Sequence, residues 1–363
     1  MDEEKKEYQI QREINIRKII ITGIVVVLIL AVVIIFSLYI AEEGFRKWVD
    51  INVLRKDISS ESAATIDLNV DKNNQIVCYN KYIGILNEKN LKLYNQSGEN
   101  ITDISVNINT AIFSTNDKYL AIAEKNGQEL CVISDKTYSW SQKVDGEILQ
   151  IYINKNGYVV LVTTDTTYKS IITVYDNNGK QLMRSFLSST RVVDISMSND
   201  NKYVAYAEID TSGTLIKSSV KIISIEKAQS NSAESTVYTT DAENSKMIIK
   251  IQYQEKGELV CVYDDSINIV KDGQEQELIK KDDETTFISG NLGNSIAYIK
   301  EEQRGVFDSS STLNIVNSSS NQTYKYNFDE IAKEMYTNGN VIGINIGTEI
   351  YFVSTNGMLI KKY

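Results

Sequence analysis

Carboxylates are the residues of this chain best able to do chemistry, because the sequence contains no histidine. The lack of histidine excludes Ser-His-Asp and Cys-His nucleophilic schemes, histidine acid–base catalysis and histidine metal sites. Paired carboxylates can hydrolyse glycosidic bonds or bind calcium, and acidic groups occur at residues 264–265, 282–284 and 301–302. Neighbouring residues of a strand point to opposite faces. We therefore interpret these groups as solvated charge and predict no catalytic residue.

The cysteines give neither a disulfide framework nor a metal site. Cys78, Cys131 and Cys261 are far apart in the sequence, and each lies inside a short apolar run. Metal sites use closely spaced cysteines, and an odd count leaves one cysteine without a disulfide partner. We expect all three to be small buried hydrophobic residues, and we expect no metal ion.

The overall charge argues against a nucleic acid partner. The chain has a net charge of −10 and no cluster of Lys and Arg. Proteins that bind nucleic acid need clustered cations to neutralise phosphates, so we expect no nucleic acid partner.

Residues 19–41 form an apolar run of 23 residues without a charge. At 1.5 Å per residue, a helix of this length spans the roughly 30 Å hydrocarbon core of a bilayer. The run is longer than the apolar part of a cleaved signal peptide, and residues 39–41 are a poor cleavage site. We predict one transmembrane helix, which makes membrane lipid the first partner. A cleaved signal peptide and a buried core helix are the alternatives.

Cations near this run favour a cytoplasmic N-terminus. Arg17 and Lys18 adjoin the run, whereas the first cations after it, Arg46 and Lys47, begin five residues beyond its end. Lys and Arg accumulate on the cytoplasmic side of a span. We predict a cytoplasmic tail at residues 1–18 and a single-pass cell-membrane protein whose C-terminal part is extracytoplasmic.

A repeated pair of short strands fills the rest of the chain. Each pair encloses a polar turn of Asn, Asp, Lys or Gly, as in residues 112–123 (IFSTNDKYLAIA). A second strand–turn–strand pattern, as in residues 172–186, falls between these copies. The first residues of the second strands are Tyr82, Tyr119, Tyr158, Tyr203, Glu258, Ser295 and Asn340, which are 37 to 55 residues apart. Propeller blades repeat about every 40–45 residues.

Seven copies of four strands predict an all-β fold, a seven-bladed β-propeller at residues 61–363. A large β-sandwich or two smaller β domains are the alternative. Residues 65–70 alternate in polarity, and we expect them to close the ring beside residues 358–362. We also expect one short helix at residues 329–335, a flexible insertion at residues 228–235, and an amphipathic juxtamembrane stalk at residues 42–60.

The chain resembles the pyrroloquinoline-quinone-like and WD40-like propellers, since residues 174–180 (VYDNNGK) are similar to a quinoprotein-type repeat. The charged tail, the span, the stalk sequence FRKWVDINVL (45–54) and the segments 82–87 and 123–130 resemble a clostridial, Gram-positive family of unknown function. That family consists of single-pass membrane proteins with a propeller ectodomain, so the resemblance implies fold and placement but no reaction. The repeated tryptophans and adjacent cysteine pair of quinoproteins are missing, so we expect no cofactor.

The long connections of the predicted blades fall on one face. Residues 163–170, 209–219 and 300–311 extend the links between second and third strands. Loops on rigid scaffolds often carry function, although long polar loops can also be tolerated insertions. The candidate binding residues on this face are Asp165, Tyr168, Lys169, Asp210, Lys217, Glu301, Arg304 and Phe307.

These features predict a membrane-anchored extracytoplasmic propeller that serves as a non-enzymatic binding or scaffold module of the cell envelope. Its partner would be a protein or the cell wall, bound at the propeller face. A carboxylate-dependent envelope hydrolase or lyase, and a sensor that relays to a cytoplasmic partner, are the alternatives. Two carboxylates about 5–10 Å apart in a central pocket would favour the hydrolase.

Overall fold

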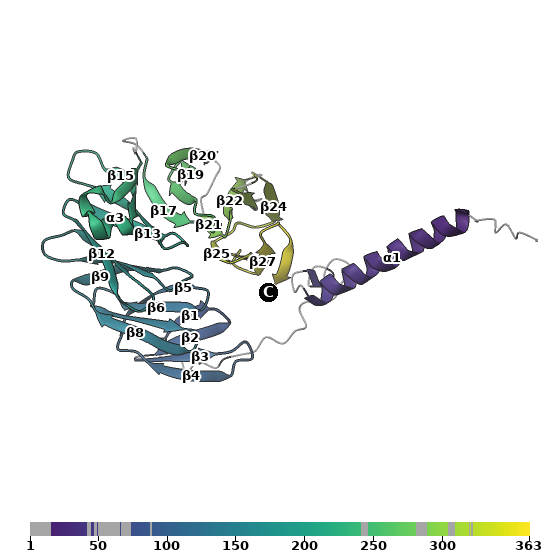
Figure 1. Cartoon of the computed structure of the whole chain (residues 1–363), viewed down its shortest axis with the longest axis horizontal. Helices are drawn as coiled ribbons and strands as arrows, with labels where there is room; N and C mark the ends of the chain where they lie inside the picture. Colours follow the sequence, from purple (N-terminus) through teal and green to yellow (C-terminus); the bar gives the residue numbers. More distant parts are fainter. Residues whose placement is uncertain are drawn as a thin grey trace, which may run out of the picture.

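The computed structural model of the chain describes residues 16–41, 45–46, 49, 66, 74–87, 89–240, 246–280, 289–303, 309–318, 320 and 322–363. In these ranges one long helix precedes seven antiparallel sheets of four strands each. The sheets are arranged as blades, and helix α1 (Ile16–Ala41) lies apart from them (Figure 1). The fold is therefore a seven-bladed β-propeller, and the alternative of a β-sandwich is wrong.

Each blade consists of four consecutive strands that pair in sequence order. The strands of blades one to four are β1 Gln75–Tyr79, β2 Tyr82–Asn87, β3 Asn90–Tyr94, β4 Asn100–Ser105, β5 Ala111–Asn116, β6 Tyr119–Glu124, β7 Glu129–Ser134, β8 Thr137–Lys143, β9 Glu147–Ile153, β10 Val159–Thr164, β11 Ser170–Tyr175, β12 Gln181–Leu187, β13 Thr190–Met197, β14 Tyr203–Asp210, β15 Lys217–Ser224 and β16 Thr236–Thr239. Those of blades five to seven are β17 Ile248–Tyr253, β18 Leu259–Tyr263, β19 Ser266–Lys271, β20 Gln274–Lys280, β21 Ser289–Leu292, β22 Ser295–Gln303, β23 Ser309–Asn317, β24 Thr323–Phe328, β25 Glu334–Asn338, β26 Val341–Asn345, β27 Ile350–Ser354 and β28 Leu359–Lys362.

The number of buried residues in a strand depends on the strand's position within its blade. Strands β10 and β11 are buried along almost their whole length, because adjacent blades cover both of their faces. The outer strand β8 has one buried residue, Trp140, in a polar sequence. Strands β1, β5, β9, β13 and β17 follow one another around the axis, and β21 lies beside β25. The first strand of each blade therefore lines a central channel.

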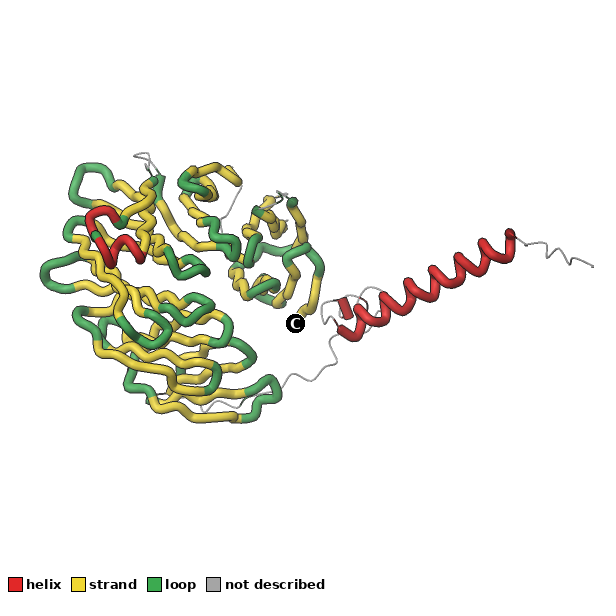
Figure 2. Tube along the Cα trace, in the orientation of Figure 1, coloured by secondary structure: helices red, strands yellow, loops and turns green. Residues whose placement is uncertain are grey.

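The seven turns between first and second strands share one backbone feature. Each contains a residue with a positive φ of 49° to 87°, which favours Asn, Asp or Gly. These residues are Asn80, Asp117, Gly157, Asn201, Gly257, Gly293 and Gly339. We call the side that carries these turns the turn face. The opposite side, with the links between second and third strands, is the loop face. Figure 2 shows the strands and connections along the chain trace.

Serine hydroxyls near the loop face bond one blade to the next. Ser170 Oγ accepts a hydrogen bond from the backbone N–H of Val192 at 3.0 Å. Ser311 Oγ accepts one from Ala332 at 2.9 Å. Both serines begin or nearly begin a third strand and are 1% exposed or less. Buried N–H groups at the blade junctions thus gain partners, as close packing requires.

Three local predictions had different outcomes. The helix expected at residues 329–335 is wrong, because β25 begins at Glu334. The flexible insertion is also wrong, because residues 225–230 form helix α3, capped by the Ser224 hydroxyl and held by buried Ile225. The predicted closing strand at residues 65–70 lies outside the described residues apart from Ile66. Blade seven takes its fourth strand from β28.

Helix α1 contains the one stretch in the described residues that is long and apolar enough to cross a membrane. This stretch is Gly23–Ala41, with a mean hydropathy of 3.3. Its side chains are exposed along almost the whole length, unlike those of a core helix. A membrane anchor and a signal sequence both have this character. The stalk at residues 42–60 lies outside the described residues, except residues 45, 46 and 49, which are helical.

Candidate binding site in the central channel

A cavity of about 730 Å³ opens at the turn face of the central channel. All seven blades contribute to it through the ends of their first strands or the turns that follow. Ligand sites in proteins are commonly concave, of 300–1,000 Å³, and few in number. The position on the axis and the volume make this cavity the candidate site.

Tyrosines form the apolar part of the cavity wall. Tyr79 is buried, and its hydroxyl donates to the backbone oxygen of Asp135 at 2.6 Å. Burial raises the pKa of Tyr152 and Tyr253, so both hydroxyls stay neutral at physiological pH. Tyr336 differs, because it is 67% exposed. Three tyrosines are thus fixed by the fold and one is free to meet a ligand.

Amide side chains form most of the polar rim. They belong to Asn80, Asn116, Asn199, Gln252 and Asn338, which come from five different blades. Each amide offers both donors and acceptors. The Asn80 amide also donates to Asp135 Oδ1 at 3.2 Å, which ties blade one to blade two. A neutral ligand with its own amides or hydroxyls would match this rim.

The charged groups of the cavity balance one another. Lys155 and Lys250 line the cavity together with Asp117 and Glu255. The two carboxylates belong to blades two and five, which are not neighbours. The described residues contain no group of three or more metal-ligating side chains. The cavity therefore has the character of a polar binding surface with no net charge.

One further carboxylate lies in the channel wall. Asp194 Oδ2 accepts a hydrogen bond from the backbone N–H of Ile251 at 2.7 Å, which joins blades four and five. Burial raises the pKa of Asp194, while hydrogen bonds from Ile251 and Ile195 lower it. The carboxylate is occupied by backbone donors, so its role is to hold the two blades together.

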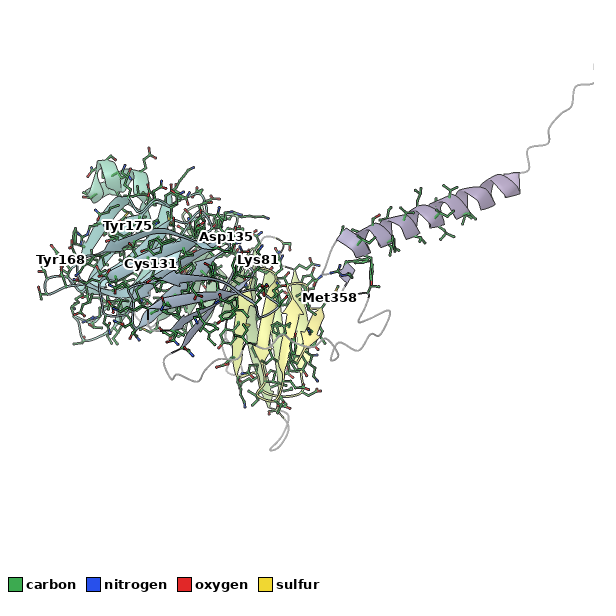
Figure 3. The ribbon with its side chains drawn as sticks, turned by 90° about the horizontal axis from the view of Figure 1, so that it is seen from below. Lys81, Cys131, Asp135, Tyr168, Tyr175 and Met358 are labelled. Atoms are coloured by element: carbon green, nitrogen blue, oxygen red, sulfur yellow. The ribbon has the colours of Figure 1, made fainter. Side chains whose placement is uncertain are left out.

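The prediction that all three cysteines are buried is wrong for Cys78, which is exposed and lines the cavity. Val77 and Tyr79 point into the cluster between blades one and two, so the alternation of β1 turns Cys78 to the other side. Cys131 and Cys261 are buried as expected. Burial raises the pKa of the Cys131 thiol to about 12. Figure 3 labels Cys131 among the packed side chains.

The six described residues of the predicted binding surface lie on the loop face, away from this cavity. Asp165, Tyr168 and Lys169 belong to the β10–β11 connection, and Asp210 pairs with Lys217 at the facing ends of β14 and β15. Glu301 lies in β22. The last two residues, Arg304 and Phe307, lie outside the described residues.

Several of these loop side chains are used by the loops themselves. Asp165 Oδ1 accepts hydrogen bonds from Thr167 and Tyr168 N–H, each at 2.7 Å. The Tyr168 ring (Figure 3) lies 4.9 Å from the Phe186 ring, and Lys169 Nζ donates to Ser189 O at 2.9 Å.

The structure brings Lys169, Asp210 and Lys217 together. Hydrogen bonds from Ser212 lower the pKa of Asp210, and the two lysines lower it further.

Sequence reasoning missed the channel rim and two exposed apolar residues. Leu215 and Ile216 are 59% and 52% exposed in the β14–β15 loop. The rim could have been predicted from the sequence, because its turns are the same Asn, Asp and Gly turns that reveal the repeat. Nothing in the sequence, however, says which face of the ring holds the cavity.

The fold and cavity define the class of this protein: a seven-bladed propeller with a polar cavity in its central channel. Residues 54–363 match a family of unknown function (DUF5711), and the chain belongs to this family. No curated protein matches the chain. The match confirms the expected family of unknown function, while a clostridial origin stays a prediction.

Solved structures with the same architecture are distant in sequence. Hsv2p of Kluyveromyces lactis has a TM-score of 0.50 at 13% identity, covering 80% of this chain and 99% of that one. Its form with loop 6CD replaced by a Gly-Ser linker has a TM-score of 0.51 at 12% identity, with the same coverage. BamB from Moraxella catarrhalis has a TM-score of 0.48 at 10% identity, covering 82% and 89%. At such identities the likeness shows the fold alone.

Proposed function

We propose that this protein is a membrane-anchored, extracytoplasmic propeller that binds a partner without catalysis, as a binding or scaffold module of the cell envelope. The observation that carries the proposal is the lining of the channel cavity by four tyrosines, four asparagines and two glycines, with balanced charges. Antibody loops use the same residue types, since tyrosine supplies rigid contact area and asparagine supplies adaptable hydrogen bonds. The partner would be a protein or a cell-wall component.

The backbone of the rim supports this proposal. Each blade closes its rim turn with a left-handed residue, and inner-strand hydrogen bonds such as that from Ile153 N–H to Ser114 Oγ, at 2.9 Å, join consecutive blades. A site on rigid elements loses little conformational entropy on binding. A second proposed surface is the loop face, with Leu215 and Ile216 as its apolar part. Its candidate residues are Asp165, Tyr168, Lys169, Asp210, Lys217, Glu301, Arg304 and Phe307.

The anchor supports the proposed location. Residues 19–41 would cross the membrane, residues 1–18 would form the cytoplasmic tail, and residues 42–60 would link the anchor to the propeller at 61–363. The apolar stretch of α1 and the cations before it agree with this topology. A ring tied to the membrane by a short stalk would meet partners at the membrane surface.

Photocrosslinking on intact cells tests the binding site. A photoreactive residue would replace Asn199 on the channel rim, Tyr168 on the loop face, or Glu277 on the outer strand β20 as a control. Capture of one defined partner from Asn199 alone supports the channel, and capture from Tyr168 alone moves the site to the loop face. Equal capture at Glu277, or none at either test position, refutes specific binding.

Cys78 tests the topology directly, because it is exposed while Cys131 and Cys261 are buried. A maleimide that does not cross membranes should label Cys78 on intact cells, and a Cys78→Ser variant should remove the label. Labelling that appears only after the cells are broken open would place the propeller in the cytoplasm.

A further inference from the structure

In the described residues, the first and last blades each have an apolar face against which no other blade packs. Six buried apolar clusters join consecutive blades from one to seven, and no such cluster joins blade seven to blade one in the described residues. Ile76 on β1 is 57% exposed, Tyr336 on β25 is 67% exposed and Ile350 on β27 is 45% exposed. Figures 1 and 2 show these two blades at the two ends of the ring. We call this junction the seam.

At three of the six packed junctions, the same kind of hydrogen bond joins the innermost strands of consecutive blades. Ser114 Oγ of blade two accepts from the backbone N–H of Ile153 in blade three at 2.9 Å. Ser196 Oγ of blade four accepts from the N–H of Tyr253 in blade five at 2.9 Å. Between blades three and four, the Tyr152 hydroxyl makes the corresponding bond to the Met197 backbone.

These three bonds occupy the same place relative to the rim turns. The accepting side chain lies two residues before the last residue that pairs across the rim turn. That last residue is Asn116 for Ser114, Asn154 for Tyr152 and Ser198 for Ser196. The donating N–H belongs to the residue directly before the equivalent last paired residue of the next blade. The same count at the seam, where the last residues before the turns are Asn338 and Tyr79, gives Tyr336 and Cys78.

Tyr336 is thus the counterpart of Tyr152, with the same residue type at the same position. The Cys78 N–H is the counterpart of the Met197 N–H. In an antiparallel pair only alternate residues bond to the partner strand, so this N–H of the innermost strand is directed away from β2. Cys78 and Tyr336 also line the channel cavity from opposite sides of the seam.

We propose that the seam is a side entrance to the central channel, and that it closes when the Tyr336 hydroxyl accepts a hydrogen bond from the Cys78 backbone N–H. Closure covers Ile76 and Tyr336 and completes the ring with a fourth copy of the inter-blade bond. Opening admits a ligand laterally, which the six packed junctions do not allow. The role as an entrance rests on the proposed binding function, whereas the closure itself does not.

Disulfide trapping in the full-length chain tests closure without any ligand. In a Tyr336→Cys variant the new thiol should bond to native Cys78 under mild oxidation, seen as a linked peptide pair by mass spectrometry. Cys131 and Cys261 are buried and do not compete. The control is Thr348→Cys, also exposed in blade seven but on the β26–β27 connection at the loop face. Failure of the first variant to crosslink, or equal crosslinking in both, overturns closure.

A second measurement isolates the hydroxyl. Tyr336→Phe removes the proposed acceptor from a side chain that is already exposed, so the blades should fold as before, which the melting temperature checks. Alkylation of Cys78 should become at least about three-fold faster in this variant, because the seam stays open longer. An unchanged alkylation rate would show that the hydroxyl does not hold the seam. Partner binding is measured separately, so a failed binding proposal would leave these results intact.

Discussion

The buried carboxylate of Glu208 offers the sharpest test of how a blade is held together. Its side chain is 5% exposed and lies 2.6 Å from Lys221 Nζ. Thr190 Oγ1 donates to it at 2.6 Å and Ser219 Oγ at 3.1 Å. These contacts join β13, β14 and β15 of blade four. Glu208→Gln keeps the shape of the side chain but removes its charge.

The expected cost follows from these contacts. Hydrogen bonds to a charged group contribute about 1.5–3 kcal/mol each, and the amide of Gln can still accept from one donor. Breaking a fully buried ion pair costs about 3–5 kcal/mol, but Lys221 is 31% exposed and can turn to water. We expect Glu208→Gln to lower the free energy of unfolding by about 2–4 kcal/mol. At about 2 °C per kcal/mol for a domain of this size, the melting temperature falls by about 4–8 °C.

Calorimetry of the detergent-solubilised chain measures this shift. The matched control is Glu277→Gln on the exposed side of β20, which should move the melting temperature by less than about 1 °C. Lys221→Met should destabilise more than Glu208→Gln, because it leaves the more deeply buried partner without a counterion. A Glu208→Gln shift no larger than the control, or the reverse order of the two variants, would refute the reasoning.

Two further predictions concern a rim glycine and the channel carboxylate. In thermal melts, Gly157→Ala should destabilise the fold by about 1–3 kcal/mol more than Gly257→Ala. Both glycines have φ above +80°. A Cβ at Gly157 would lie 2.7 Å from the Tyr119 ring, whereas one at Gly257 would meet no atom within 4 Å. Equal losses would show that the ring simply moves aside. Burial raises the pKa of Asp194 above its usual 3.8, so the folded state binds the proton more tightly and stability falls as pH rises from about 4 through the raised value. Asp194→Asn should therefore gain stability relative to the wild type between pH 4 and 7 in denaturant titrations, and a constant difference would contradict the shift.

The repeat could be recognised from the sequence because the rim turns need left-handed backbone conformations. Asn80, Asp117 and Gly157 hold left-handed turns, and few other residues tolerate that conformation. The expected first residues of the second strands agree with the structure to within one residue, as at Tyr203 for β14 and Glu258 before β18. Local backbone chemistry therefore fixed the blade count.

The cavity and Cys78 could not be predicted in the same way. A strand pattern shows which residues alternate, but not which of the two faces meets a neighbouring blade. Cys78 lies in an apolar run like Cys131, yet it faces the seam and the channel, while Cys131 lies in the packed third strand β7. That difference depends on the closure of the ring, which is a property of the whole chain.

The first position of the second strand shows how the repeat persists while its sequence changes. In blade two Tyr119 packs against the rim turn of blade three at Gly157. Blade five has Glu258 at this position, 5% exposed, with Lys271 Nζ at 2.8 Å and the Ser318 hydroxyl of blade six at 3.2 Å. The Tyr119 ring and the buried Glu258 carboxylate both contact the next blade, so both preserve the junction. This position therefore requires a contact with the next blade but not a particular residue type. For this reason tyrosine occupies it in blades one to four and other residues occupy it in blades five to seven, while the backbone repeat continues.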